Sequence, residues 1–238
     1  MSKHRFFYGW VIVIAALFIA LAGYGIQYSF GIFFKPLLTD LGWTRAATAG
    51  AFSLYLVVHG ISGVFMGGLA DKYGAKRPII AGGVLFLLAM VLLSRISAIW
   101  QLYVLWGLVA GVAIGAIYTP LAATIPKWFI KKRGLALGIM TSGIGLGTLV
   151  MSPISAYLIT NYGWRNSYII VGIAASVVII GAAMPLVPDP ATKGLFPDSE
   201  AGLPSQRINA HTSAQQEQIE FPEAVRNKQL WLLSFIYF

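Results

Sequence analysis

Residues 84–93 read Val-Leu-Phe-Leu-Leu-Ala-Met-Val-Leu-Leu, an uninterrupted apolar run. A membrane β-strand alternates apolar and polar residues over about ten positions, and this run does not alternate. The run belongs to a longer segment, Pro78–Leu93, that carries no polar side chain. Because a backbone surrounded by lipid has to satisfy its own hydrogen bonds, such a segment crosses the membrane as a helix. The run therefore indicates an all-α integral membrane protein.

Five further segments share this apolar character, and a length of about 20 residues is enough for a helix to cross the hydrocarbon core. Short loops that carry much of the charge separate them. We therefore predict that residues 1–187 form a six-helix transmembrane bundle. Besides Pro78–Leu93, the predicted spans are Trp10–Phe34, Ala46–Leu69, Ile99–Ile125, Gly134–Ile159 and Ser167–Val187.

The composition changes after Val187 to Pro, Ser, Gln and acidic residues. Pro188, Pro190, Pro197 and Pro204 oppose a long helix there, so we predict a flexible cytoplasmic linker over residues 188–228. A new apolar segment begins near Leu230, and residues 229–238 are predicted to start a seventh transmembrane helix. This order describes the N-terminal half of a two-half protein, with the C-terminal six-helix half absent from this chain.

The overall composition argues against soluble functions. Hydrophobic residues make up 58% of the chain and charged residues 11%, against about 25% charged residues in ordinary soluble domains. The net charge of +9 lies in short clusters between apolar runs, whereas nucleic-acid binding needs a basic stripe on a folded surface, so no nucleic acid is expected. An intramembrane enzyme would need several acids or histidines inside the spans. We expect no enzyme activity, no cofactor and no metal.

The orientation follows from the positions of Lys and Arg. The N-terminus and the loops 72–77 and 127–133 are rich in these residues, while the alternate loops hold few. By the positive-inside rule the N-terminus is cytoplasmic. We expect a multi-pass protein of the plasma (inner) membrane, with the lipid bilayer as its surroundings.

Polar side chains inside a span mark the helices that face protein or water, because such groups are costly in lipid. Tyr24, Gln27 and Tyr28 follow helical spacing and therefore share one face of the first span. Tyr118 lies in the fourth span and His59 in the second. His59 is either a proton-linked site or a neutral histidine bonded to a neighbouring helix. The first, second, fourth and fifth spans are candidates for lining a central cavity, whereas Pro78–Leu93 is predicted to be peripheral.

Residues 67–77 read Gly-Gly-Leu-Ala-Asp-Lys-Tyr-Gly-Ala-Lys-Arg. This loop resembles the signature between the second and third helices of the major facilitator superfamily, with Ala75 in place of its first basic residue. The resemblance implies a twelve-helix fold of two halves, of which this chain supplies the first. Asp71 at a helix end can either pair with Lys or Arg or accept hydrogen bonds from a helix N-terminus, and Gly74 permits a tight turn. The predicted conformational-switch residues are Gly67, Asp71, Lys72, Gly74, Lys76, Arg77 and Arg133.

Two stretches resemble the monocarboxylate and oxalate–formate branch of that superfamily. One is Gly-Ile-Gln-Tyr-Ser-Phe-Gly at 25–31, and the other contains Tyr118 and the residues 128–138. The lead-in 227–231 also looks like the approach to that branch's seventh helix. The resemblance implies that Gln27, Tyr28 and Tyr118 line a carboxylate site whose cation comes from the second half. Ile144 departs from the tyrosine of some oxalate carriers. Tyr24 and His59 complete the predicted substrate-binding set.

The resemblance implies a secondary active transporter that moves a small organic anion by alternating access. Candidate solutes are monocarboxylates such as lactate, pyruvate or formate, or a small dicarboxylate. Two alternatives use the same pocket: a carrier of another small solute, such as a sugar or a drug, and a non-transporting sensor. A channel is disfavoured because neither a ring of charge nor a carbonyl filter motif appears.

The predicted orientation can be tested by cysteine labelling, because the chain has no native cysteine. Cysteines placed singly at Ser2, Ala75 and Ser205 should resist an impermeant thiol reagent added to intact cells. A cysteine at Asn161, in a predicted outer loop, should react. The opposite labelling pattern would reverse the orientation.

Overall fold

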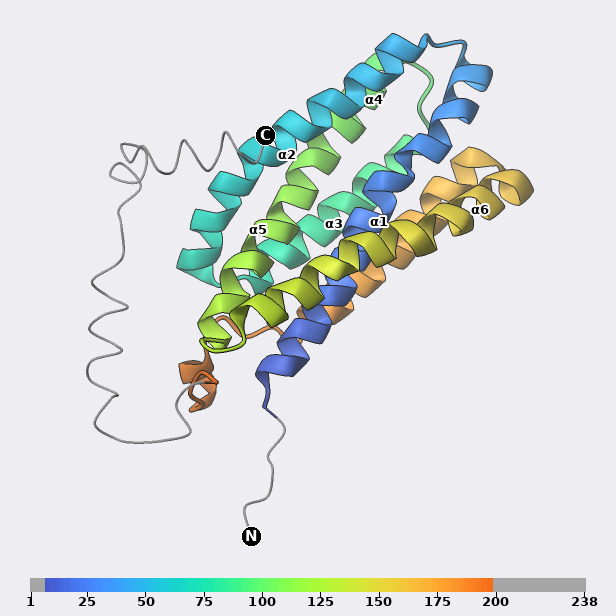
Figure 1. The fold of residues 1–238 in the computed structure, drawn as a ribbon. Helices are drawn as coiled ribbons and strands as arrows, with labels where there is room; N and C mark the ends of the chain where they lie inside the picture. Colours follow the sequence, from blue (N-terminus) through green and yellow to red (C-terminus); the bar gives the residue numbers. More distant parts are fainter. Residues whose placement is uncertain (1–6, 199–238) are drawn as a thin grey trace. The chain divides into compact units, whose positions relative to one another are not determined.

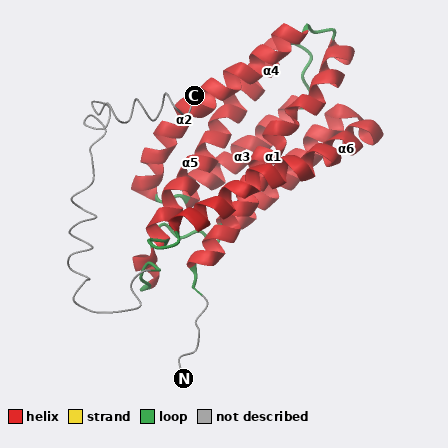
Figure 2. Cartoon of the chain, viewed as in Figure 1, coloured by secondary structure: helices red, strands yellow, loops and turns green. Residues whose placement is uncertain are grey.

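The computed structural model describes residues 7–198, and within them all regular structure is helical (Figures 1 and 2). Five stretches are long and apolar enough to cross a membrane: α1, α2, α3, the continuous segment Ile99–Trp128, and α6. The predicted start of a seventh helix and most of the predicted linker lie outside the described residues. The elements are α1 (Gly9–Leu41), α2 (Arg45–Tyr73), α3 (Lys76–Leu93), α4 (Ile99–Leu102), η1 (Tyr103–Ala110), α5 (Gly111–Trp128), α6 (Arg133–Ala183) and η2 (Pro190–Lys193).

The last two predicted spans form one element, the 51-residue α6, so the predicted count of six separate helices is not confirmed. A straight helix of that length would extend about 77 Å. Yet the indole nitrogen of Trp128, just before α6, donates to the carbonyl of Val187, just after it, at 3.0 Å. The chain therefore reverses within α6 (Figure 1). The reversal lies at Gly163, whose φ of 73° and ψ of 159° are non-helical.

Two helix pairs organise the bundle. α1 packs mainly along α6, α2 mainly along α5, and α3 contacts both α5 and α6. One face of α3 is buried, including Phe86 and Met90, while Leu88 and Leu92 are exposed. The helix expected to be peripheral thus has one packed face and one open face.

The fourth predicted span is less regular than its sequence indicates. It begins as the single α-helical turn α4, continues as the π-helical segment η1, and becomes α-helical again in α5. π-Helical turns are rare and often lie near functional sites. Here η1 contributes Trp106, which is fully buried against Phe30 of α1 with ring centroids 4.6 Å apart.

Small residues let the backbones of α1 and α6 approach closely. A Cβ built on Gly143 would lie 2.5 Å from the carbonyl oxygen of Leu17, and one built on Gly147 would clash with the carbonyl oxygen of Leu21. On α1, a Cβ on Gly25 would lie 2.8 Å from the Gly147 carbonyl oxygen. The two glycines on α6, four residues apart, therefore allow close helix packing.

The beginning of the predicted linker contacts the loop between α5 and α6. The carboxylate of Asp198 accepts hydrogen bonds from the backbone N–H groups of residues 130–132, at 2.6–3.0 Å. Partial desolvation alone would raise the pKa of Asp198, but these three hydrogen bonds and the charge of Lys132 hold that pKa below its usual value. Residues 189–198 therefore make defined contacts, although the sequence predicts a flexible linker.

The close contact between α1 and α6 predicts different effects for two neighbouring glycines. Gly147→Ala places a methyl group against the backbone of Leu21, so we expect a loss of about 1–3 kcal/mol of stability, as for other overpacked sites. Gly145→Ala is the matched control because nothing lies within 4 Å of its Cβ. Melting temperatures of the two variants in detergent provide the measurement. Equal melting temperatures would mean that the contact is not tight.

Candidate functional site

Polar aromatic side chains gather where α1, α2 and α5 meet. The ring of Tyr24 on α1 lies 5.3 Å from that of Tyr118 on α5 and 6.0 Å from that of His59 on α2, centroid to centroid. The Tyr24 hydroxyl and His59 Nε2 are 3.2 Å apart and share a hydrogen bond. Tyr28 is the next member, with its centroid 6.4 Å from that of Tyr24. We call Tyr24, Tyr28, Tyr55, His59 and Tyr118 the tyrosine–histidine cluster.

Gln27 joins this cluster through Tyr55. The Tyr55 hydroxyl donates to Oε1 of Gln27 at 2.9 Å, which connects α2 to α1. Gln27 is 3% exposed and Tyr55 is fully buried. The Tyr55 ring is nearly parallel to that of His59, with a 7° angle and a centroid distance of 5.9 Å. The same ring contacts Phe52 at 5.8 Å and Trp106 at 5.6 Å.

An open cavity of about 380 Å³ lies beside the cluster between α1 and α2. Gln27 and Tyr28 are polar residues of its wall, and Tyr28 is 49% exposed. Most of the wall is apolar, as in typical sites for small molecules. Its other lining residues are Phe30, Gly31, Phe34, Ala49, Phe52 and Ser53.

The structure brings the five predicted substrate-binding residues into one region. Tyr24, Gln27, Tyr28, His59 and Tyr118 come from three helices, and Gln27 and Tyr28 line the cavity. Tyr55 lies in the predicted second span but was not among the predicted site residues. Its position four residues before His59, on the same helical face, could have identified it from the sequence.

The tyrosine–histidine cluster and the described cavity wall contain no Asp, Glu, Lys or Arg. Their polar groups are phenol hydroxyls, one imidazole, one carboxamide and the hydroxyl of Ser53. These groups can donate several hydrogen bonds to an anion but provide no formal positive charge. A charge partner for an anion would therefore have to come from residues outside this described site.

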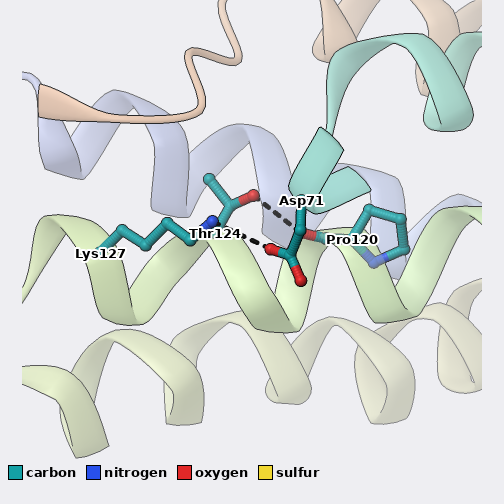
Figure 3. A network of polar contacts seen from close by, with 4 residues as sticks. All are labelled: Asp71, Pro120, Thr124 and Lys127. Atoms are coloured by element: carbon teal, nitrogen blue, oxygen red, sulfur yellow. Dashed lines mark hydrogen bonds and ion pairs between the residues drawn. The ribbon is translucent and has the colours of Figure 1, made fainter. Parts of the chain in front are cut away.

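The predicted switch motif lies at the C-terminal end of α2 and just after it. Asp71 forms an ion pair with Lys127 of α5, with Nζ and Oδ1 3.1 Å apart (Figure 3). The predicted pairing of Asp71 with a cation is confirmed, and the partner is a residue far along the sequence. Lys72, the neighbour of Asp71, instead lies over the ring of Tyr73 at 5.3 Å. In the same part of α5, the Thr124 hydroxyl donates to the Pro120 carbonyl at 2.7 Å (Figure 3).

Other residues of the motif connect the turn after α2 to the rest of the bundle. Gly74 has a φ of 79°, so it supplies the turn conformation that favours glycine. Lys76 donates through Nζ to the Met184 carbonyl at 2.9 Å, and Arg133 donates through Nε to the Phe129 carbonyl at 2.7 Å. A Cβ on Gly67 would lie 3.1 Å from Thr119, which indicates tight packing. Arg77 is exposed.

The sequence model of the Major Facilitator Superfamily matches residues 11–238. The chain belongs to the major facilitator superfamily. Its relatives place it in the branch of monocarboxylate transporters and oxalate:formate antiporters. The chain is 30% identical to human monocarboxylate transporter 14 over 217 residues, and the alignment covers 88% of this chain and 42% of that protein. The oxalate:formate antiporter of Oxalobacter formigenes is 31% identical, with 74% of this chain and 41% of the antiporter covered.

One solved structure shares the fold of this chain. It is the crystal structure of a bacterial homologue of the human lysosomal transporter Spinster, in an inward-facing and unoccupied conformation. The TM-score is 0.65 at 16% identity, and the match covers 91% of this chain and 50% of that one. The chain therefore spans about half the length of the superfamily proteins that it matches.

The Asp71–Lys127 pair predicts a change in rate with little change in stability. Both side chains are substantially exposed, at 65% and 44% respectively, and such pairs contribute about 0.2–1 kcal/mol. Asp71→Asn should leave the melting temperature nearly unchanged but lower the uptake rate, because the pair connects α2 to α5. Lys127→Gln should give the same decrease, and the double variant should add little to it.

Uptake rates of the complete protein, and its order of preference among candidate solutes, measure this effect. Lys131→Gln is the control, because it removes an exposed lysine from the same end of the bundle. A change of solute preference at full rate in Asp71→Asn would contradict the assignment, since a residue at that end should not contact the solute.

Proposed function

We propose that this chain forms the first half of a secondary active transporter that moves a small organic anion by alternating access. The observation that carries the proposal is the convergence of Tyr24, Gln27, Tyr28 and Tyr118 from α1 and α5 beside an open cavity. The names of the relatives, monocarboxylate transporter and oxalate:formate antiporter, support a carboxylate as the solute. Lactate, pyruvate, formate and a small dicarboxylate are the candidates.

The proposed binding mode follows from desolvation. A carboxylate that leaves water loses its hydration shell, and hydrogen-bond donors have to replace that shell. The hydroxyls of Tyr28 and Tyr118 and the amide nitrogen of Gln27 are donors of the required kind. Since the described site is neutral, we assign the balancing positive charge to the second six-helix half. The neutral first half would supply hydrogen bonds that orient the solute.

His59 supports the site by holding Tyr24. Its hydrogen bond to the Tyr24 hydroxyl, at 3.2 Å, favours a histidine bonded to a neighbouring helix over one that acts directly on the solute. His59 also stacks on Tyr55, so it connects the two polar contacts between α1 and α2. We therefore assign His59 a role in keeping the cluster assembled.

Alternating access requires the half to move as a body against its partner half. The contacts between α1 and α6 and between α2 and α5 favour such rigid movement, because close backbone packing resists internal sliding. The Asp71–Lys127 pair is proposed to bias the equilibrium between the two access states. The proposed location is the plasma membrane, with the N-terminus on the cytoplasmic side.

Tyr118→Phe tests the binding role of the cluster, because it deletes one hydroxyl and keeps the ring. If that hydroxyl donates to the anion, affinity should fall about tenfold or more, which equals about 1.4 kcal/mol. If it only ties helices together, affinity should stay within about threefold while the melting temperature falls, since intramembrane hydrogen bonds average about 0.6 kcal/mol. Tyr162→Phe, near the reversal of α6, is the matched control.

The measurement is binding and uptake of labelled lactate, pyruvate, formate and oxalate by the complete transporter, with and without a pH gradient. Melting temperatures of the same samples separate folding defects from binding defects. The carboxylate-site assignment fails if both Tyr118→Phe and Gln27→Ala keep the native affinity. A transporter that takes up none of the four anions would refute the proposed solute class.

A further inference from the structure

Gln27 can present either of two opposite chemical groups to the cavity that it lines. Its carboxamide has an oxygen that accepts hydrogen bonds and a nitrogen that donates two. An anion is attracted by the nitrogen and repelled by the oxygen. The direction in which the amide lies therefore decides whether this part of the wall favours or opposes a carboxylate.

The contact with Tyr55 sets that direction. The Tyr55 hydroxyl donates to Oε1 of Gln27 at 2.9 Å, so the oxygen faces α2. Tyr55 is fully buried and is absent from the cavity wall, whereas Gln27 lines it. Among the described residues, no group accepts a hydrogen bond from the Gln27 nitrogen. The nitrogen is thus left to donate into the cavity.

Tyr55 is held in place by the rings around it. Phe52 and His59 stack on it with interplanar angles of 17° and 7°, and Trp106 approaches at 30°. Aromatic side chains packed on both sides lose most of their freedom to move. Its hydroxyl is therefore fixed in position, and among the described contacts the Gln27 oxygen is its acceptor.

We infer that Tyr55 is a positioning residue that orients the Gln27 amide, nitrogen toward the cavity, and so makes the first half selective for anions. The inference rests on the proposed function and extends it to a residue that does not touch the solute. If the Tyr55 hydroxyl is removed while the Gln27 nitrogen still points at the solute, the Gln27 oxygen is buried and has no hydrogen-bond donor. A buried unpaired acceptor is costly, so the amide would turn its oxygen toward the cavity water instead.

A double-mutant cycle on the complete transporter tests the inference, with labelled lactate, formate and oxalate as probes. Gln27→Ala and Tyr55→Phe should each weaken binding about tenfold for the anion that the native protein binds. Because Tyr55 acts through Gln27, the double variant should also be weakened about tenfold, and not a hundredfold. A structural role of Tyr55 alone would not produce this non-additivity.

Tyr168→Phe is the matched control. Tyr168 is also a buried tyrosine, stacked on Phe33 at 4.1 Å, but its hydroxyl has no hydrogen-bond partner among the described residues. Its removal should leave anion affinity unchanged. A comparable loss of affinity in Tyr168→Phe would show that any buried tyrosine hydroxyl affects binding, which would overturn the specific role of Tyr55.

A second variant leaves Tyr55 intact and reverses the chemistry at Gln27. Gln27→Glu keeps the shape and the oxygen that Tyr55 contacts but replaces the donor nitrogen by an acceptor oxygen. We expect anion binding to fall further than in Gln27→Ala, because the carboxylate faces the solute. Native affinity in Gln27→Glu would overturn the inferred orientation.

The outcomes also separate this inference from the proposed function. Failure of the native protein to bind any of the three anions, or native affinity in Gln27→Ala, would refute the carboxylate site and the inference together. A loss in Gln27→Ala beside native affinity in Tyr55→Phe would refute the role of Tyr55 alone. A loss of affinity in the double variant equal to the product of the two single losses would also refute the role of Tyr55 alone.

Discussion

The close backbone contact between α1 and α6 is the constraint on which the site depends. It extends along α1 from Leu17 to Gly25, and it is possible because Gly143 and Gly147 have no side chains. The directions of side chains around a helix follow from its rotation. Fixing α1 over these residues therefore fixes where Tyr24, Gln27 and Tyr28 project. A larger residue at Gly147 would move α1 and displace the proposed substrate-binding residues without touching them.

The packing of α2 on α5 connects the tyrosine–histidine cluster to the Asp71–Lys127 pair. The Ser62 hydroxyl donates to the Gly111 carbonyl at 3.3 Å, and a Cβ on Gly63 would lie 2.8 Å from the Thr119 hydroxyl. Near its middle, α2 carries Tyr55 and His59 of the tyrosine–histidine cluster, and near its C-terminal end it carries Asp71. A shift of α2 against α5 would therefore alter the Asp71–Lys127 pair and the cluster together.

The neutrality of the cluster would be a physical advantage for the proposed site, which has to be stable both with and without a bound solute. A buried charge without a partner is very costly in a membrane, whereas neutral hydroxyls and an amide can remain bonded to one another when no solute is present. The contacts of Tyr24 with His59 and of Tyr55 with Gln27 are of this kind. In the proposed mechanism the first half can thus stay folded in both states, and it would contribute to selectivity by orienting donors more than by charge.

The sequence by itself determined the features that depend on local patterns. Long apolar runs predicted membrane helices, and the residues of 67–77 identified the superfamily. Helical spacing alone predicted that Tyr24, Gln27 and Tyr28 share one face of α1. In the structure, Tyr24 of this face contacts His59 and Tyr118. Contacts between distant residues depended on how the helices pack. The pairing of Asp71 with Lys127 was of this kind. The π-helical turn at 103–110 likewise appeared only in the structure, whereas the reversal at Gly163 falls in the loop that the sequence predicted between two spans. The direction of the Gln27 amide also depended on packing. The sequence does not show whether a glutamine presents its oxygen or its nitrogen, and here the Tyr55 hydroxyl beside the oxygen decides it.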